Sequence, residues 1–103
     1  MSDKKNTIIQ LSDCWDYESG FFGRLRQGVF DDELFEKTVE ILKQLSFDDE
    51  DEYLPKDAVS LIWIIPLFMG WQKDRVSATI DMNNYAKKST IIENEVMRIL
   101  GVP

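Results

Sequence analysis

The sequence predicts a mainly α-helical protein, a compact bundle of four or five helices. Three observations support this. Apolar residues recur at helical spacing over residues 34–45, a nearly all-apolar segment follows Pro55, and an apolar stripe ending at a glycine closes the chain. The chain has 103 residues, of which 44% are hydrophobic, enough for one domain with one core. We therefore expect residues 1–103 to form a single binding domain.

The helix over residues 32–45 is the clearest element. Asp31 and Asp32 supply a cap and negative charge at its amino end, where the helix dipole is positive. Apolar positions then recur every three or four residues, which is typical of a helix with one buried side. These positions are Leu34, Phe35, Thr38, Ile41, Leu42 and Leu45.

The next helix is expected over residues 56–65. Pro55 suits the position at its start, because proline there sacrifices no helical hydrogen bond. The segment that follows is apolar almost all round, which predicts burial on every side. We therefore place Trp63, with Ile62 and Ile65, in the core, and expect Pro66 to end or kink the helix.

The two ends of the chain are harder to assign. Asp13 can cap a first helix that runs towards Arg26. Residues 7–11 are rich in β-branched side chains, and residues 76–82 alternate apolar and polar side chains, although the latter also read as a helix. The alternative fold is therefore an α+β domain with two short strands, at 7–11 and 76–82.

The last helix is predicted over residues 91–100. Thr90 and Glu93 form a capping box at its start. Gly101 suits the left-handed residue that ends a helix, and Pro103 prevents continuation.

The composition favours a cytoplasmic protein. The longest apolar run, 61–69, contains Pro66 and falls short of the about 20 residues that a membrane-spanning helix needs. The amino-terminal residues lack the long apolar region of a secretory signal. Cys14 is the single cysteine, so an internal disulfide is excluded, as is usual in reducing compartments.

Negative charge is concentrated in one segment. The formal net charge is −7, and residues 31–52 carry ten acids against Lys37 and Lys43, a net of −8. A polyanion repels phosphate backbones, so direct nucleic-acid binding is not expected. A concentrated negative surface attracts a basic protein and speeds its association.

The sequence lacks the side chains that most often carry catalysis. The chain has no histidine, which removes the usual general base and the commonest metal ligand. Two carboxylates could still act as acid and base, but the acids of residues 48–52 have no apolar pocket to separate their pKa values. The same acids are consecutive and lack the central glycine of an EF-hand calcium loop. We therefore expect no enzyme, no metal and no cofactor, with a carboxylate-only enzyme as the remote alternative.

Aromatic residues beside acids mark a second candidate surface. Trp15, Asp16 and Tyr17 adjoin each other, and Trp and Tyr are enriched at binding hot spots, although core packing also suits Trp15. Asp13 and Asp16 are expected to raise the pKa of Cys14, which favours packing over reactivity. The candidate partner-binding residues are Asp31, Asp32, Asp48, Asp49, Glu50, Asp51, Glu52, Trp15, Asp16, Tyr17 and Trp71.

Residues 15–26, which read Trp-Asp-Tyr-Glu-Ser-Gly-Phe-Phe-Gly-Arg-Leu-Arg, resemble a segment of the small immunity proteins of bacterial contact-dependent growth-inhibition systems. The Ile65-Pro66-Leu67 step is similar too. The resemblance covers about a third of the chain and transfers no binding residue. It implies a cytoplasmic antitoxin that binds the C-terminal toxin domain of its partner, frequently a nuclease such as an RNase, and blocks it.

The charge of the chain suits that role independently of the resemblance. Nuclease active sites are basic because they bind phosphates, and carboxylates can occupy the positions of those phosphates. The alternative is a cytoplasmic regulatory adaptor without a toxin partner, in which the acids serve solubility.

Overall fold

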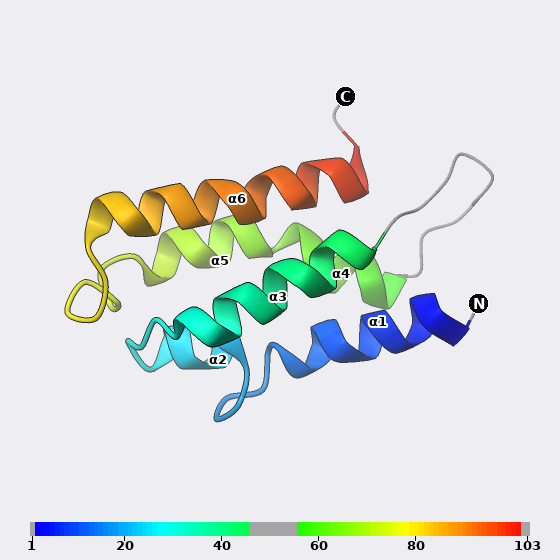
Figure 1. Ribbon diagram of the computed structural model, residues 1–103, viewed down its shortest axis with the longest axis horizontal. Coiled ribbons are helices and arrows are strands. Elements are labelled where there is room, and N and C mark those ends of the chain that lie inside the picture. Colours follow the sequence, from blue (N-terminus) through cyan, green and yellow to red (C-terminus); the bar gives the residue numbers. More distant parts are fainter. Residues whose placement is uncertain (1, 46–55, 102–103) are drawn as a thin grey trace.

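A computed structural model describes residues 2–45 and 56–101 and contains six helices (Figure 1). The helices are α1 Ser2–Asp13, α2 Phe21–Arg26, α3 Asp32–Gln44, α4 Lys56–Trp63, α5 Ile65–Gln72 and α6 Met82–Leu100. Only Ile64 separates α4 from α5, so these two helices form one broken rod. The predicted helical bundle is confirmed, and no strand occurs in the part of the chain that the structure describes.

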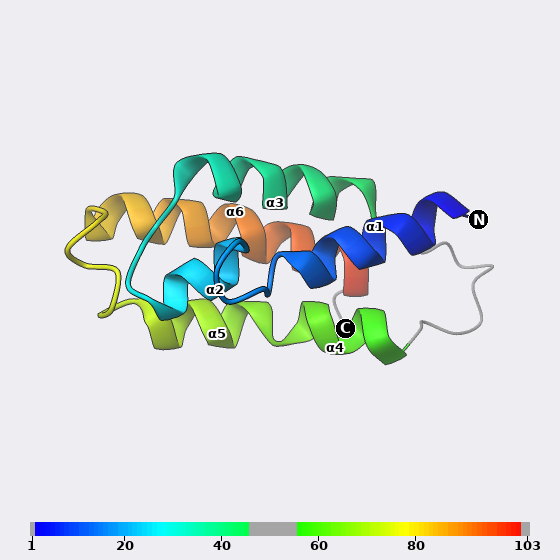
Figure 2. The same cartoon turned by 90° about the horizontal axis from the view of Figure 1, so that it is seen from below.

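The helices occupy four positions around a common core. Figures 1 and 2 together show α6 opposite the pair α1 and α2, and α3 opposite the rod formed by α4 and α5. The α3 helix packs on α1, α2 and α6, whereas α4 and α5 pack on the other side of the same three helices. The molecule therefore has two outer faces, on α3 and on α4–α5, that point in opposite directions.

An aromatic cluster fills one half of the core. Phe21 of α2 packs edge-on against Phe30 and Phe35, with ring centroids 5.3 and 5.8 Å apart. Phe22, the next residue, contacts Phe68 of α5 at 5.9 Å. The short α2 helix therefore joins α3 to α5 through two adjacent buried rings.

The strand at 7–11, which belonged to the alternative fold, and the predicted helix from Asp13 to Arg26 are both wrong. Residues 7–11 lie in α1, because Thr7, Leu11 and Cys14 bury one side at the helical spacing of four and three. The chain then turns through residues 14–20, and Asp13 ends α1 instead of starting a helix. Tertiary burial outweighs the β propensity of this segment.

The strand at 76–82, the other strand of the alternative fold, and the predicted capping box at Thr90 are also wrong. Residues 73–80 form turns, in which Thr79 Oγ1 accepts a hydrogen bond from Phe30 N (3.1 Å) and is 3.1 Å from Gly28 O, to which it donates. Asp81 caps α6 by accepting from Asn84 N at 3.1 Å. Thr90 lies within α6 and donates to Ala86 O, so the predicted helix over 91–100 is the second half of a longer one.

The placement of Trp63 in the core is wrong as well, since 51% of this residue is exposed. Ile62 and Ile65 are fully buried, as predicted. Only one side of the α4–α5 rod faces the core, and apolar residues on the other side remain in solvent. The predicted interruption is present, because α4 stops at Trp63 and Pro66 lies in the first turn of α5.

Candidate protein-binding surface

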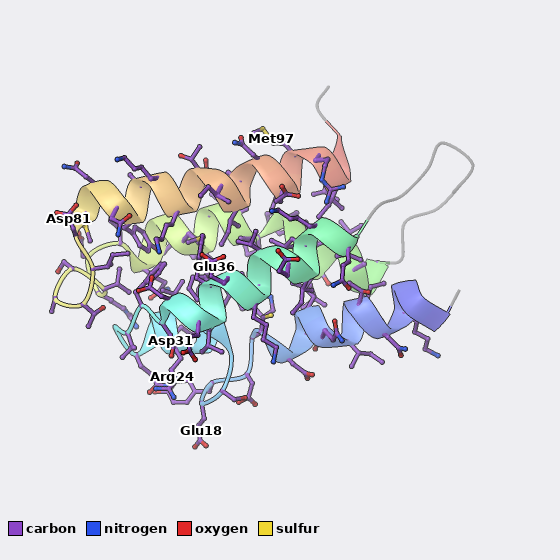
Figure 3. The ribbon with its side chains drawn as sticks, in the orientation of Figure 1. Glu18, Arg24, Asp31, Glu36, Asp81 and Met97 are labelled. Carbon is purple, nitrogen blue, oxygen red and sulfur yellow. The ribbon has the colours of Figure 1, made fainter. Side chains whose placement is uncertain are left out.

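Three glutamates form an acidic strip along the exposed side of α3. Glu33, Glu36 and Glu40 are exposed and separated by three and four residues, so they lie on one side of the helix. Figure 3 shows Glu36 in the middle of this side. Within the described residues, no ion pair involves any of these carboxylates. Their charge is therefore free to act on a partner.

The two predicted acids at the start of α3 have partners inside the protein. The Asp31 carboxylate accepts a hydrogen bond from Leu34 N at 3.0 Å and caps the helix, as expected. The Asp32 carboxylate lies 2.7 Å from Lys88 Nζ, which also sits 4.9 Å from the Phe35 ring centroid. Asp32 is therefore partly neutralised by α6.

A groove of about 540 Å³ lies between α1 and α3, beside the acidic strip. Asp13, Asp16 and Glu40 contribute carboxylates to its lining, and Lys37 contributes a single ammonium. The rest of the lining is part polar, with two glutamines, and part apolar, with Leu34 and Ile41 among the apolar side chains. A groove with three carboxylates, one ammonium and apolar walls suits a long basic side chain, whose stem is apolar and whose end is cationic.

Asp16 is held in place by the turn that follows α1. Its carboxylate accepts hydrogen bonds from Ser19 N (2.9 Å), Ser19 Oγ (2.8 Å) and Glu18 N (3.1 Å). These bonds favour the ionised form and lower the pKa of the Asp16 carboxyl below its ordinary value. Asp16 therefore keeps its negative charge at the edge of the groove.

Two glycines allow this turn to close tightly. A Cβ at Gly20 would lie 2.2 Å from the carbonyl oxygen of Cys14, and a Cβ at Gly23 would lie 1.9 Å from that of Asp16. Both distances are far inside van der Waals contact. Residues 14–20 are therefore a connection that packs closely against the start of α2, and this packing requires glycine at Gly20 in the turn and at Gly23 in α2.

Trp15 and Tyr17 differ in burial, with Trp15 packed against the core and Tyr17 exposed. The Trp15 ring stacks on Phe22 at 4.4 Å and meets Phe68 edge-on at 4.8 Å, so it belongs to the edge of the core. Tyr17 is 62% exposed, and its carbonyl accepts a hydrogen bond from Gln27 Nε2. Of the two aromatic candidates, Tyr17 is the more accessible to a partner.

Cys14 is a buried neutral thiol. Its Sγ accepts a hydrogen bond from Thr38 Oγ1 at 3.5 Å and donates to Gln10 O at 3.5 Å. Burial is the main cause that raises the pKa of this thiol, and nearby Asp13 contributes least. The raised pKa was predicted correctly, but its cause was predicted to be the neighbouring acids and not burial. A buried thiol of this kind packs and does not react readily.

The structure does not bring all the predicted residues together. Trp71 is 63% exposed but lies on α5, on the opposite side of the molecule from α3. Asp48, Asp49, Glu50, Asp51 and Glu52 fall outside the described residues. The sequence prediction counted Glu33, Glu36 and Glu40 in the acidic segment 31–52 and on the polar side of the helix, but it did not name them as partner-binding residues.

The described residues contain no cluster of three metal-binding side chains and no helix that could span a membrane. No family model matches the chain, and no curated protein or solved structure is similar to it.

Proposed function

We propose that this protein is an immunity protein that binds the C-terminal domain of a cognate toxin and neutralises it without catalysing a reaction. The observation that carries the proposal is the strip of exposed carboxylates on α3, Glu33, Glu36 and Glu40, beside a groove that holds Asp13 and Asp16. The resemblance of residues 15–26 to immunity proteins of contact-dependent growth-inhibition systems supplies the class of partner.

The geometry suits a basic nuclease surface. Carboxylates on a rigid helix can take the positions of substrate phosphates and accept charge-assisted hydrogen bonds from arginine or lysine. The groove would receive one such side chain, with its stem against Leu34 and Ile41 and its charged end near Asp13 and Asp16. The acidic segment as a whole would steer the basic partner before contact.

Binding explains this surface better than catalysis by carboxylates alone. A general acid near neutral pH needs a raised pKa, which burial in an apolar pocket provides. The pKa of the Asp16 carboxyl is lowered instead, by hydrogen bonds to its ionised form. A carboxylate that stays ionised is a good acceptor for a basic partner and a poor proton donor.

The experiment is co-purification with the product of the neighbouring gene, which the proposal expects to carry the toxin domain, followed by stopped-flow association of the two. Glu36→Gln with Glu40→Gln removes two charges from α3, whereas Asp74→Asn with Glu93→Gln removes two charges elsewhere. We expect the α3 pair to slow association about tenfold at low salt and to weaken its salt dependence, since charges at an interface rim act mainly on the on-rate.

The control pair is expected to slow association by less than about twofold. Equal effects of the two pairs would show that only net charge matters and would contradict an α3 interface. Failure of the toxin domain to bind at all would contradict the toxin assignment and leave the adaptor alternative.

A further inference from the structure

An aromatic stripe runs along the outer side of the α4–α5 rod. Trp63, Leu67 and Trp71 are 51%, 49% and 63% exposed, and each lies four residues from the next. Because four residues span about one helical turn, the three side chains form one row. Figure 2 shows that this rod makes up one outer side of the bundle, opposite α3.

This outer face has an unusual composition for a surface in water. No charged residue occurs from residue 58 to residue 72, although the rod is exposed along one side. Exposed positions of α3 and α6, by contrast, carry glutamate and lysine. Surface helices normally carry charged and polar side chains on the side away from the core. The face therefore has the composition of a surface that another protein covers.

Gly70 gives an independent indication of a contact. It is exposed within α5, its φ is not in the left-handed region, and no atom lies within 4 Å of a Cβ built on it. Glycine destabilises a helix interior relative to alanine, and no contact with the described residues requires glycine here. Its lack of a side chain lets another backbone or a large side chain approach the helix closely beside Trp71.

We propose that the face is covered by the same face of a second copy of this chain, in a two-fold symmetric dimer with antiparallel rods crossing at Leu67. The stripe is symmetric about Leu67, with a tryptophan four residues before it and another four residues after it. A two-fold axis at Leu67 places Trp63 of each copy against Trp71 and Gly70 of the other. A two-fold dimer uses the same surface on both copies, so the row of one copy packs against the row of the other.

The charges at the ends of the rod favour this orientation. Lys56 and Asp57 lie at one end and Lys73 and Asp74 at the other, and all four are exposed. Antiparallel rods bring the two ends together, so that Lys56, seven residues before Trp63, comes near Asp74 of the second copy, seven residues after Leu67. Parallel rods would place like charges together, which is unfavourable. An anionic membrane could also cover an apolar face, but it would repel a chain with a net charge of −7.

The size of the stripe sets the stability of the dimer. The exposed parts of its three side chains amount to roughly 350 Å² per copy, while a stable interface buries about 800 Å² per partner. The stripe would thus form the centre of an interface of moderate affinity, with dissociation in roughly the micromolar range. The α3 faces would remain free on the two outer sides of the dimer. The inference does not depend on the proposed function.

The test is sedimentation velocity of the chain alone from about 1 μM to about 1 mM. Leu67→Glu and Gly70→Glu place a charge in the centre of the stripe, and the open space at Gly70 lets the second change leave the fold intact. Matched controls place the same charge on α6: Met97→Glu replaces a residue of similar exposure, 46%, and Ala86→Glu replaces another small exposed residue. Circular dichroism checks that every variant remains helical.

We expect the wild type and both controls to pass from monomer to dimer as concentration rises. The dimer dissociation constants of both stripe variants should be at least tenfold higher. A wild type that stays at the mass of one chain throughout would overturn the dimer, as would stripe variants that associate like the controls. For orientation, Lys56→Asp should weaken the dimer and added Asp74→Lys should restore it. A double variant no better than the single one would overturn the antiparallel arrangement.

Discussion

The hydroxyl of Tyr85, on α6, donates a hydrogen bond of 2.7 Å to the carbonyl oxygen of Met69, on α5. The backbone N–H of Lys73, which follows α5, bonds to the carbonyl of Gly70. Tyr85 therefore supplies a donor to a carbonyl in the last turn of α5, where helical partners run out. The bond is buried, and it ties the α4–α5 rod to α6.

Replacing Tyr85 with Phe should destabilise the protein by about 1–3 kcal/mol. The change keeps the ring but leaves the buried carbonyl of Met69 without this donor, and a buried unsatisfied polar group is costly. Urea denaturation followed by circular dichroism measures the free energy of unfolding. Tyr17→Phe, at an exposed site, is the control and should stay within about 0.5 kcal/mol of the wild type. Equal stabilities of the two variants would contradict the role of the bond.

The same residue predicts a loss of stability at alkaline pH. Burial raises the pKa of Tyr85 from 10.0 to about 12. Below pH about 10 the hydroxyl is protonated in both the folded and the unfolded state, so its full contribution is present. Between pH about 10 and about 12 the unfolded chain loses this proton first, and stability falls. The fall should be smaller in Tyr85→Phe, and an identical pH profile would argue against the raised pKa.

Phe22 and Trp63 should differ sharply in their effect on stability. Phe22 is fully buried and stacks on Trp15, so Phe22→Ala should cost about 3–5 kcal/mol. Trp63 is half exposed, and Trp63→Ala should cost only about 1 kcal/mol when measured at low concentration, where the proposed dimer does not contribute. A loss at Trp63 as large as at Phe22 would place Trp63 in the core, as the sequence first indicated.

Glycine-to-alanine changes should have opposite signs at two positions. Gly23→Ala places a Cβ 1.9 Å from the Asp16 carbonyl oxygen, so the turn must move, and a loss of about 2 kcal/mol or more is expected. Gly70→Ala meets no atom and improves helix propensity, so a gain of about 0.5–1 kcal/mol is expected. Thermal melts of both variants at low protein concentration provide the measurement, and a stabilised Gly23→Ala would contradict the described turn.

Local chemistry in the sequence predicted α3 well. Asp31 caps it and Leu34, Phe35 and Leu42 mark its apolar side, so both the start and the buried residues were readable. The start of α6 was equally readable in principle, because Asp81 precedes Asn84 by three residues and caps it in the same way. The capping box expected at Thr90 and Glu93 drew the predicted helix start away from Asp81.

Tertiary packing determines which side of the α4–α5 rod is buried, and the sequence pattern did not predict it. The segment around Trp63 is apolar on all sides, so its pattern carries no information on which side faces the core. Ile62, Ile65 and Met69 take the buried side, which leaves Trp63 and Trp71 outside. The groove was not predictable either, since it joins Asp13 and Asp16 to Glu40 across two helices.

The acidic run 48–52 should add to the attraction exerted by α3. It holds five of the ten acids between residues 31 and 52, and fold stability gives no reason to place five like charges together. We predict that changing Asp48, Asp49, Glu50, Asp51 and Glu52 to Asn or Gln leaves the melting temperature unchanged or slightly higher. Association with the toxin domain should slow by about tenfold at low salt, and the difference should vanish at high salt as screening increases. Association that is unaffected by the five changes would confine the attraction to the α3 strip and the groove, and association that is also flat between low and high salt would contradict an acidic interface altogether.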